Sequence, residues 1–167
     1  MKRCCVLALL GLAAWGLTAR AEHAYITLRV MRVDPDSGLS REEASARADQ
    51  EPPAGGVQPR PLFKVKAGEP LVLQFIYTNA YPHGVTKNVR IRYFLVRAEK
   101  VGQKTVPPLG ENVVTQGQFA LNFKPKCRVG ARVAFTVREP GVYLLRVDSF
   151  NTHSDHEHFA AIDVQAE

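Results

Sequence analysis

The chain has 167 residues, of which 46% are hydrophobic and 23% are charged, and its formal net charge is +6 at pH 7. Three of its basic residues lie in the first 21 positions, and without that segment 19 basic residues face 16 acidic ones, a net charge of +3. The remaining basic residues are scattered and form no long run, which argues against a nucleic-acid-binding protein.

The first 21 residues have the features of an export signal. Lys2 and Arg3 precede an apolar stretch, 6–17, that is too short to span a bilayer comfortably, and Ala19-Arg20-Ala21 fits a small-x-small cleavage site. We therefore expect a cleaved signal peptide over 1–21, a periplasmic or extracellular location and no membrane span in the mature chain. An uncleaved N-terminal anchor is the alternative.

The mature chain would keep a single cysteine, Cys127, so an intramolecular disulfide is impossible. An exported domain without a disulfide depends on its hydrophobic core, and about 145 residues are enough to build one. No local Cys/His signature accompanies Cys127, so we expect this cysteine to be inert rather than catalytic.

Strand-type alternation begins at Ala24–Val33, where apolar and polar residues follow one another with a period of two. The polar segment 34–61 comes next, and we expect it to be a flexible or partly helical insert. Within it, Ser40-Arg41-Glu42-Glu43 is a capping-box pattern that predicts a short helix over about Arg41 to Ala48. The Pro- and Gly-rich stretch 52–56 predicts a flexible link.

After the insert, the alternation returns and continues to the C-terminus. It predicts strands around 62–65, 71–77, 89–95, 119–123, 133–137, 143–147 and 160–164. Seven or eight such strands with no amphipathic helix of core length are typical of an antiparallel β-sandwich, each strand burying one face. We therefore predict one all-β, immunoglobulin-like domain over residues 22–167. Its core should bring together Phe75, Tyr93, Phe135, Tyr143, Leu145 and Ile162.

The turn Pro140-Gly141 followed by Tyr143 resembles the tyrosine corner of immunoglobulin-like domains. Other patterns of the same kind are Val65–Pro70 before a strand, Phe123-Lys124-Pro125, and His156–Asp163. Through these patterns, 62–165 resembles bacterial secreted immunoglobulin-like or fibronectin-III-like sandwich proteins. The resemblance implies a fold and an exported location, and it assigns no activity.

A weaker resemblance is to small periplasmic metal-handling sandwiches of the copper-resistance type. Those proteins place a histidine at or near the mature N-terminus and further ligands in late loops. Here His23 would be the second mature residue rather than the first. The Met-rich copper-binding segments of such proteins are also missing, because Met31 is the only mature methionine. The resemblance implies a copper site, but this chain departs from the pattern at both points.

Three of the five histidines are concentrated between the last two predicted strands. His156 and His158 have the spacing that puts two imidazoles on one face of a strand, and His153 could add a third ligand from the preceding turn. Such a set can bind copper, zinc or nickel. His83, in the loop 81–84, could complete the site if that loop lies at the same end of the sandwich.

Two other interpretations of the histidines stay open. His156 and His158 have the same parity as Ala160 and Ile162, which predicts that they close the end of the core. Alternatively, 151–157 is a solvated hairpin loop. Arg90 and Arg92 alternate on one strand face in a similar way, and we interpret them as part of a solvated sheet surface.

Enzyme signatures such as Gly-x-Ser-x-Gly, a phosphate-binding loop or His-Glu-x-x-His are absent from the sequence. We therefore expect a non-catalytic secreted or periplasmic binding or adhesion-type module. It would need no cofactor, and its partner would be a protein, a glycan or an envelope component rather than a nucleic acid. The alternative is a periplasmic copper-, zinc- or nickel-binding protein that uses His153, His156 and His158, with His83 or His23.

Overall fold

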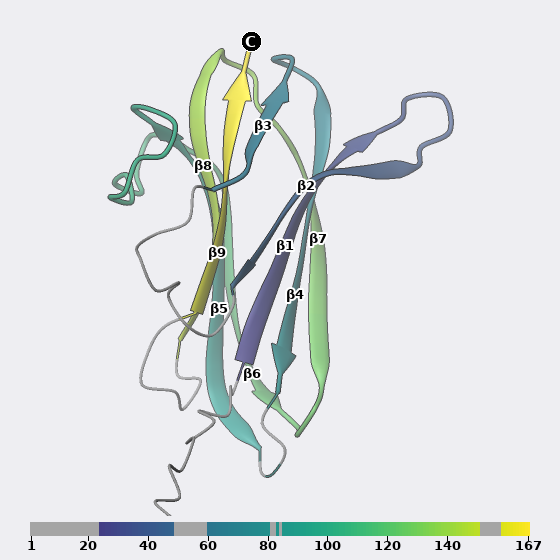
Figure 1. Cartoon of the computed structure of the whole chain (residues 1–167), viewed down its shortest axis with the longest axis vertical. Helices are drawn as coiled ribbons and strands as arrows, with labels where there is room; N and C mark the ends of the chain where they lie inside the picture. The colour runs from purple at the N-terminus through teal and green to yellow at the C-terminus, as the bar shows by residue number, and fades with distance from the viewer. Residues whose placement is uncertain (1–23, 49–59, 81–82, 84, 151–157) are drawn as a thin grey trace, which may run out of the picture.

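The computed structural model describes residues 24–48, 60–80, 83, 85–150 and 158–167. Nine strands in these ranges form two sheets that face each other (Figure 1). The four-stranded sheet has the order β2-β1-β4-β7 and contains β1 (Ala24–Val33), β2 (Ser40–Ala48), β4 (Pro70–Asn79) and β7 (Arg128–Thr136). The five-stranded sheet has the order β3-β9-β8-β5-β6 and contains β3 (Leu62–Val65), β5 (Thr86–Ala98), β6 (Val113–Phe123), β8 (Gly141–Phe150) and β9 (His158–Ala166).

The predicted β-sandwich is confirmed. Its strand pairs are antiparallel except for β3 with β9, which run parallel. Among the described residues, none forms a helix that is long and apolar enough to cross a membrane. The expected family and the single-domain boundaries stay predictions.

The core lies between the two sheets and is built from the alternate residues of each strand. The predicted core residues Phe75, Phe135, Tyr143, Leu145 and Ile162 are buried in one cluster, and Tyr93 packs against that cluster while partly exposed. Phe75 is completely buried, with its ring 5.7 Å from the Tyr93 ring and 6.0 Å from the Phe119 ring. The period-two pattern therefore identified the inward faces correctly.

The helix expected over Arg41–Ala48 is wrong, because this segment forms β2 and pairs with β1. Ala44 and Ala46 pack against the core with a period of two, while Ser45 between them is exposed. A capping box adds little to a helix this short, which is marginal without tertiary contacts. Pairing with β1 and burial of the alanines decide the outcome instead. The rest of the expected insert, 49–59, lies outside the described residues.

The outer face of the five-stranded sheet is partly buried, which single-face alternation did not predict. Phe94, Val96, Leu144 and Ala161 form a second apolar cluster there. The β5–β6 connection is fastened to the same face through Asp163, a residue only 1% exposed. Its carboxylate accepts hydrogen bonds from the Gly102 amide at 2.9 Å and from Arg60 Nη2 at 2.9 Å. These bonds hold residues near Gly102 against the sheet.

The hydrogen bond of a tyrosine corner is present. Tyr143 lies near the start of β8, and its hydroxyl donates to the backbone oxygen of Glu139 at 2.9 Å. Tyr77 offers a contrast, because it is 1% exposed and its hydroxyl has no hydrogen-bond partner in the described part of the chain. Burial raises the pKa of Tyr77 above its usual range.

These two tyrosines should respond in opposite ways to removal of the hydroxyl. Tyr143→Phe should lower the free energy of unfolding by about 1 kcal/mol, because a made hydrogen bond is lost. Tyr77→Phe should leave it unchanged or raise it, because a buried hydroxyl without a partner is removed. Urea denaturation of both variants measures the difference. Equal losses in the two variants would contradict the assigned hydrogen bonding.

Candidate functional site

The strand registers bring several strand ends to one end of the sandwich. These are the start of β1, the end of β4, the start of β5, the end of β8 and the start of β9 (Figure 1). The five histidines adjoin these ends in the sequence: His23 precedes β1, His83 lies between β4 and β5, His153 and His156 lie between β8 and β9, and His158 begins β9. The strands that flank the segment of His83 therefore end on the same side of the sandwich as the strands that flank 151–157.

The side chains of the predicted metal site are not brought together by what the structure describes. His83 is exposed, and the backbone of His158 pairs with Ser149. His23, His153, His156 and the His158 side chain lie outside the described residues. Within the described residues, no group of three His, Cys, Asp or Glu side chains could hold a metal ion. The histidine site stays a prediction.

Arginine and phenylalanine side chains share the outer face of the five-stranded sheet. Asp148, 1% exposed, accepts hydrogen bonds from Arg92 Nη2 at 2.7 Å and from Arg146 Nε. The same guanidinium groups lie over aromatic rings, with Arg146 Cζ 4.1 Å from the Phe159 centroid and Arg92 Cζ 5.1 Å from that of Phe150. Arg92 is thus held by a buried carboxylate rather than only solvated. The guanidinium groups of this cluster bind the Asp148 carboxylate and the aromatic rings beside them.

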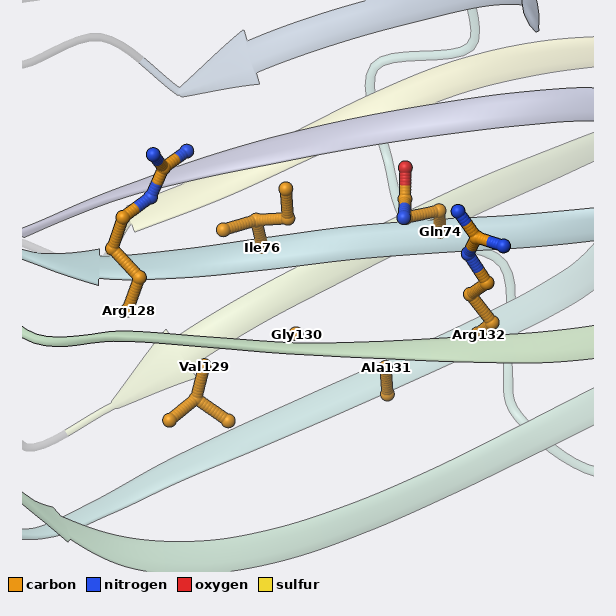
Figure 2. A pocket seen from close by; sticks show the side chains of 7 residues that line it. All are labelled: Gln74, Ile76, Arg128, Val129, Gly130, Ala131 and Arg132. Atoms are coloured by element: carbon orange, nitrogen blue, oxygen red, sulfur yellow. The ribbon is translucent and has the colours of Figure 1, made fainter.

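A shallow groove of about 380 Å³ lies on the outer face of β4 and β7. We call it the β7 groove, and it is lined by Gln74, Ile76, Arg128, Val129, Gly130, Ala131 and Arg132. Figure 2 shows Arg128, Ile76, Gln74 and Arg132 extending to one side of the sheet, while Val129 and Ala131 extend to the other. The groove therefore has a cation at each end and the Ile76 side chain between them.

The two arginines differ in how they are held. With the Gln74 amide oriented so that its oxygen faces Arg132, that oxygen accepts hydrogen bonds from Arg132 Nε at 3.0 Å and Nη2 at 3.3 Å. Arg128 is exposed and has no ion-pair partner in the ranges that the structure describes. Neither guanidinium is neutralised by a described carboxylate, so both keep their capacity to bind an anion.

Gly130 separates the two arginines and is required by close packing. It pairs with Ile76 of β4, and a Cβ atom at position 130 would lie 2.8 Å from the backbone oxygen of Phe75. A side chain is therefore excluded unless the strands shift apart. The absence of that side chain leaves the middle of the groove open above the backbone of β7.

The segment of the chain that contains β7 carries charge of one sign. Residues 112–138, which span β6, the following turn and β7, contain no aspartate or glutamate. Their basic residues are Lys124, Lys126, Arg128, Arg132 and Arg138. The expected mature chain has a net charge of only +3, so this one segment carries more net positive charge than the mature chain as a whole. Such a concentration of charge attracts anions and orients their approach.

Sequence reasoning missed this site because it looked for runs of adjacent cations. The basic residues of 112–138 are spaced two or more positions apart, so they form no run. A search for long windows without acidic residues would have found the segment. The register that sets Gly130 opposite Ile76, and Arg132 opposite Gln74, is a property of the sheet and has no local signal.

No family model matches the chain, and no curated protein matches it. Among solved structures, it is similar to a family 123 glycoside hydrolase from Clostridium perfringens, with 9% identity and a TM-score of 0.43 over 68% of this chain and 23% of that one. It is also similar to the PmoD soluble domain from Methylocystis sp. (Rockwell), with 12% identity and a TM-score of 0.44 over 84% and 90% of the two chains. A chitin binding domain from Burkholderia pseudomallei has 14% identity and a TM-score of 0.37 over 63% and 56%.

Proposed function

We propose that this chain is a non-catalytic, exported binding module that holds an anionic ligand in the β7 groove. The observation that carries the proposal is the pair Arg128 and Arg132 on one exposed face, without described carboxylate partners, in a segment without acidic residues. Guanidinium groups bind carboxylates and phosphates through paired hydrogen bonds as well as through charge.

The geometry of the groove favours an elongated ligand. Arg128 and Arg132 are four residues apart on a strand, which separates their Cα atoms by about 13 Å. A ligand that reaches both must extend along β7 and carry more than one negative charge. Ile76 between them offers an apolar contact for the uncharged part of that ligand. Acidic polymers of the envelope or surface segments of a partner protein have this chemistry.

The Arg128→Gln, Arg132→Gln double variant tests the proposal. Wild-type protein should bind polyglutamate or polygalacturonate in calorimetric titrations at low salt, and the double variant should bind about tenfold more weakly because two exposed ion pairs are lost. Binding should also weaken as salt is added, since exposed charges are screened. The melting temperature should stay near that of wild type.

A control separates the groove from net charge. Lys100 and Lys104 are exposed residues of the β5–β6 connection, and replacing both with glutamine removes the same charge elsewhere. This variant should keep most of the affinity. Equal weakening of both double variants, or no binding of either acidic polymer by wild type, would refute the proposal.

A second candidate function is transition-metal binding at the histidine end. The observation that favours it is that all five histidines adjoin strand ends gathered at one end of the sandwich. The ligands would be His153, His156 and His158 with His83, holding copper, zinc or nickel as neutral imidazoles.

If this second candidate is right, Cu²⁺, Zn²⁺ or Ni²⁺ should raise the melting temperature of wild type. The shift should vanish below about pH 6, where imidazoles become protonated. The His156→Ala, His158→Ala double variant should fold but lose the shift. Wild-type protein that shows no shift with a hundredfold excess of any of these ions would exclude the candidate.

A further inference from the structure

β7 is a long and regular edge strand. In the described sheet it pairs with β4 on one side only, through nine consecutive register positions without a bulge. It contains no proline. Edge strands of natural proteins are usually interrupted by such features, because an unbroken row of free backbone groups accepts another strand. The other long edges differ, since the β1–β2 and β5–β6 pairings contain register shifts.

Among the described residues, the apolar core is only partly covered beside this edge. Val129, Ala131 and Val133 face the core from β7 but are only partly buried. On the facing edge, Phe119 of β6 is likewise only partly buried, although it packs against the same core. Inward residues of the central strands β4 and β8, such as Phe75 and Leu145, are completely buried. One further strand beside β7 would cover this apolar margin.

The charge of β7 decides what such a strand should contain. A second copy of β7 paired antiparallel about Gly130 would set Arg128 opposite Arg132, and like charges directly opposite each other are destabilising. An acidic strand would place its carboxylates beside the same arginines. Residues of such a strand that face the sandwich would meet Val129, Ala131 and Val133, so they should be apolar.

We propose that β7 accepts an extended acidic segment of a partner protein as an added strand. The segment would alternate, with acidic residues four positions apart beside Arg128 and Arg132, a small residue beside Gly130, and apolar residues toward the core. Backbone hydrogen bonds would supply affinity and the alternating side chains specificity. The inference rests on the proposed function, because it uses the same two arginines and names the ligand class.

A capped synthetic peptide tests it. The peptide carries two glutamates four positions apart, a serine midway between them and a valine on each side of the serine. Fluorescence titration should show saturable binding to wild type and about tenfold weaker binding to Arg128→Gln, Arg132→Gln. The Arg128→Glu, Arg132→Glu variant should instead prefer the peptide in which lysines replace the glutamates. The Lys100→Gln, Lys104→Gln variant should behave as wild type.

Two further measurements separate strand addition from charge alone. N-methylation of the peptide nitrogens that would face β7 should abolish binding without changing charge, and alternate amides of β7 should become protected from hydrogen exchange in the complex. If the N-methylated peptide binds equally well, strand addition is wrong. If polygalacturonate binds and the peptide does not, the inference falls while the proposed function stands. If neither binds, both fall.

Discussion

Replacing Phe75 with alanine is expected to lower the free energy of unfolding by about 3–5 kcal/mol. The side chain is 0% exposed and lies at the centre of β4. Its ring stacks on Phe119 with an interplanar angle of 18° and contacts Tyr93 at 37°. Alanine would lose these contacts and leave a cavity between the sheets. The cavity would persist, because the close-packed side chains around it relax only partly.

Equilibrium unfolding in urea measures this loss, with Phe159→Ala as the control. Phe159 is 46% exposed on the outer face of β9, so its truncation removes less buried area than at Phe75, together with the contact to Arg146. The alanine variant at position 159 should therefore lose clearly less stability than Phe75→Ala, about 1 kcal/mol. A loss below about 1 kcal/mol for Phe75→Ala would contradict the assignment of this strand face to the core.

The second large effect is expected for Asp163→Ala, at about 3–5 kcal/mol. The Asp163 carboxylate is almost completely buried and accepts bonds from Arg60 Nε at 3.2 Å and Arg60 Nη2 at 2.9 Å. Removing it leaves the Arg60 guanidinium, only 18% exposed, without its counter-charge. It also removes the acceptor of the Gly102 amide, so the β5–β6 connection loses its attachment to the sheet.

Urea denaturation gives the energy, and hydrogen exchange over 99–112 shows the release of the connection. Glu139→Gln is the matched control, because Glu139 also pairs with an arginine, Arg97, but in an exposed ion pair whose side chains are 45% and 75% exposed. Exposed ion pairs contribute little to stability. If both variants lose the same amount, burial is not what makes the Asp163 pair important.

The sequence predicts the fold well where apolar residues alternate strongly. β4 shows this, since Leu71, Leu73, Phe75 and Tyr77 all face the core as expected. β2 shows the limit of this prediction, because its inward residues are alanines. Alanine favours a helix, yet it also fits a strand position where little space is left beside the core. The capping-box pattern then gave the wrong answer, and only pairing with β1 reveals the strand.

Sites formed across strands are harder to predict than strands. The β7 groove combines residues more than fifty positions apart, Gln74 and Ile76 with Arg128 and Arg132, which only the β4–β7 register brings together. Burial of Asp163 likewise depends on Arg60 and Gly102, neither of which is its neighbour in sequence. The histidines are the opposite case, since their clustering is visible in the sequence while their geometry is not.

The most direct test is a backbone-resolved NMR titration of the mature protein with the acidic peptide. Pairing of the peptide with β7 predicts that amide signals of Arg128–Thr136 shift most. The signal of Gln74 on β4 should follow, because its side chain accepts hydrogen bonds from Arg132. Signals of β3 and of the β5–β6 connection should stay in place. Shifts confined to the histidine end, or spread evenly over exposed basic residues, would contradict an anion-binding groove on β7.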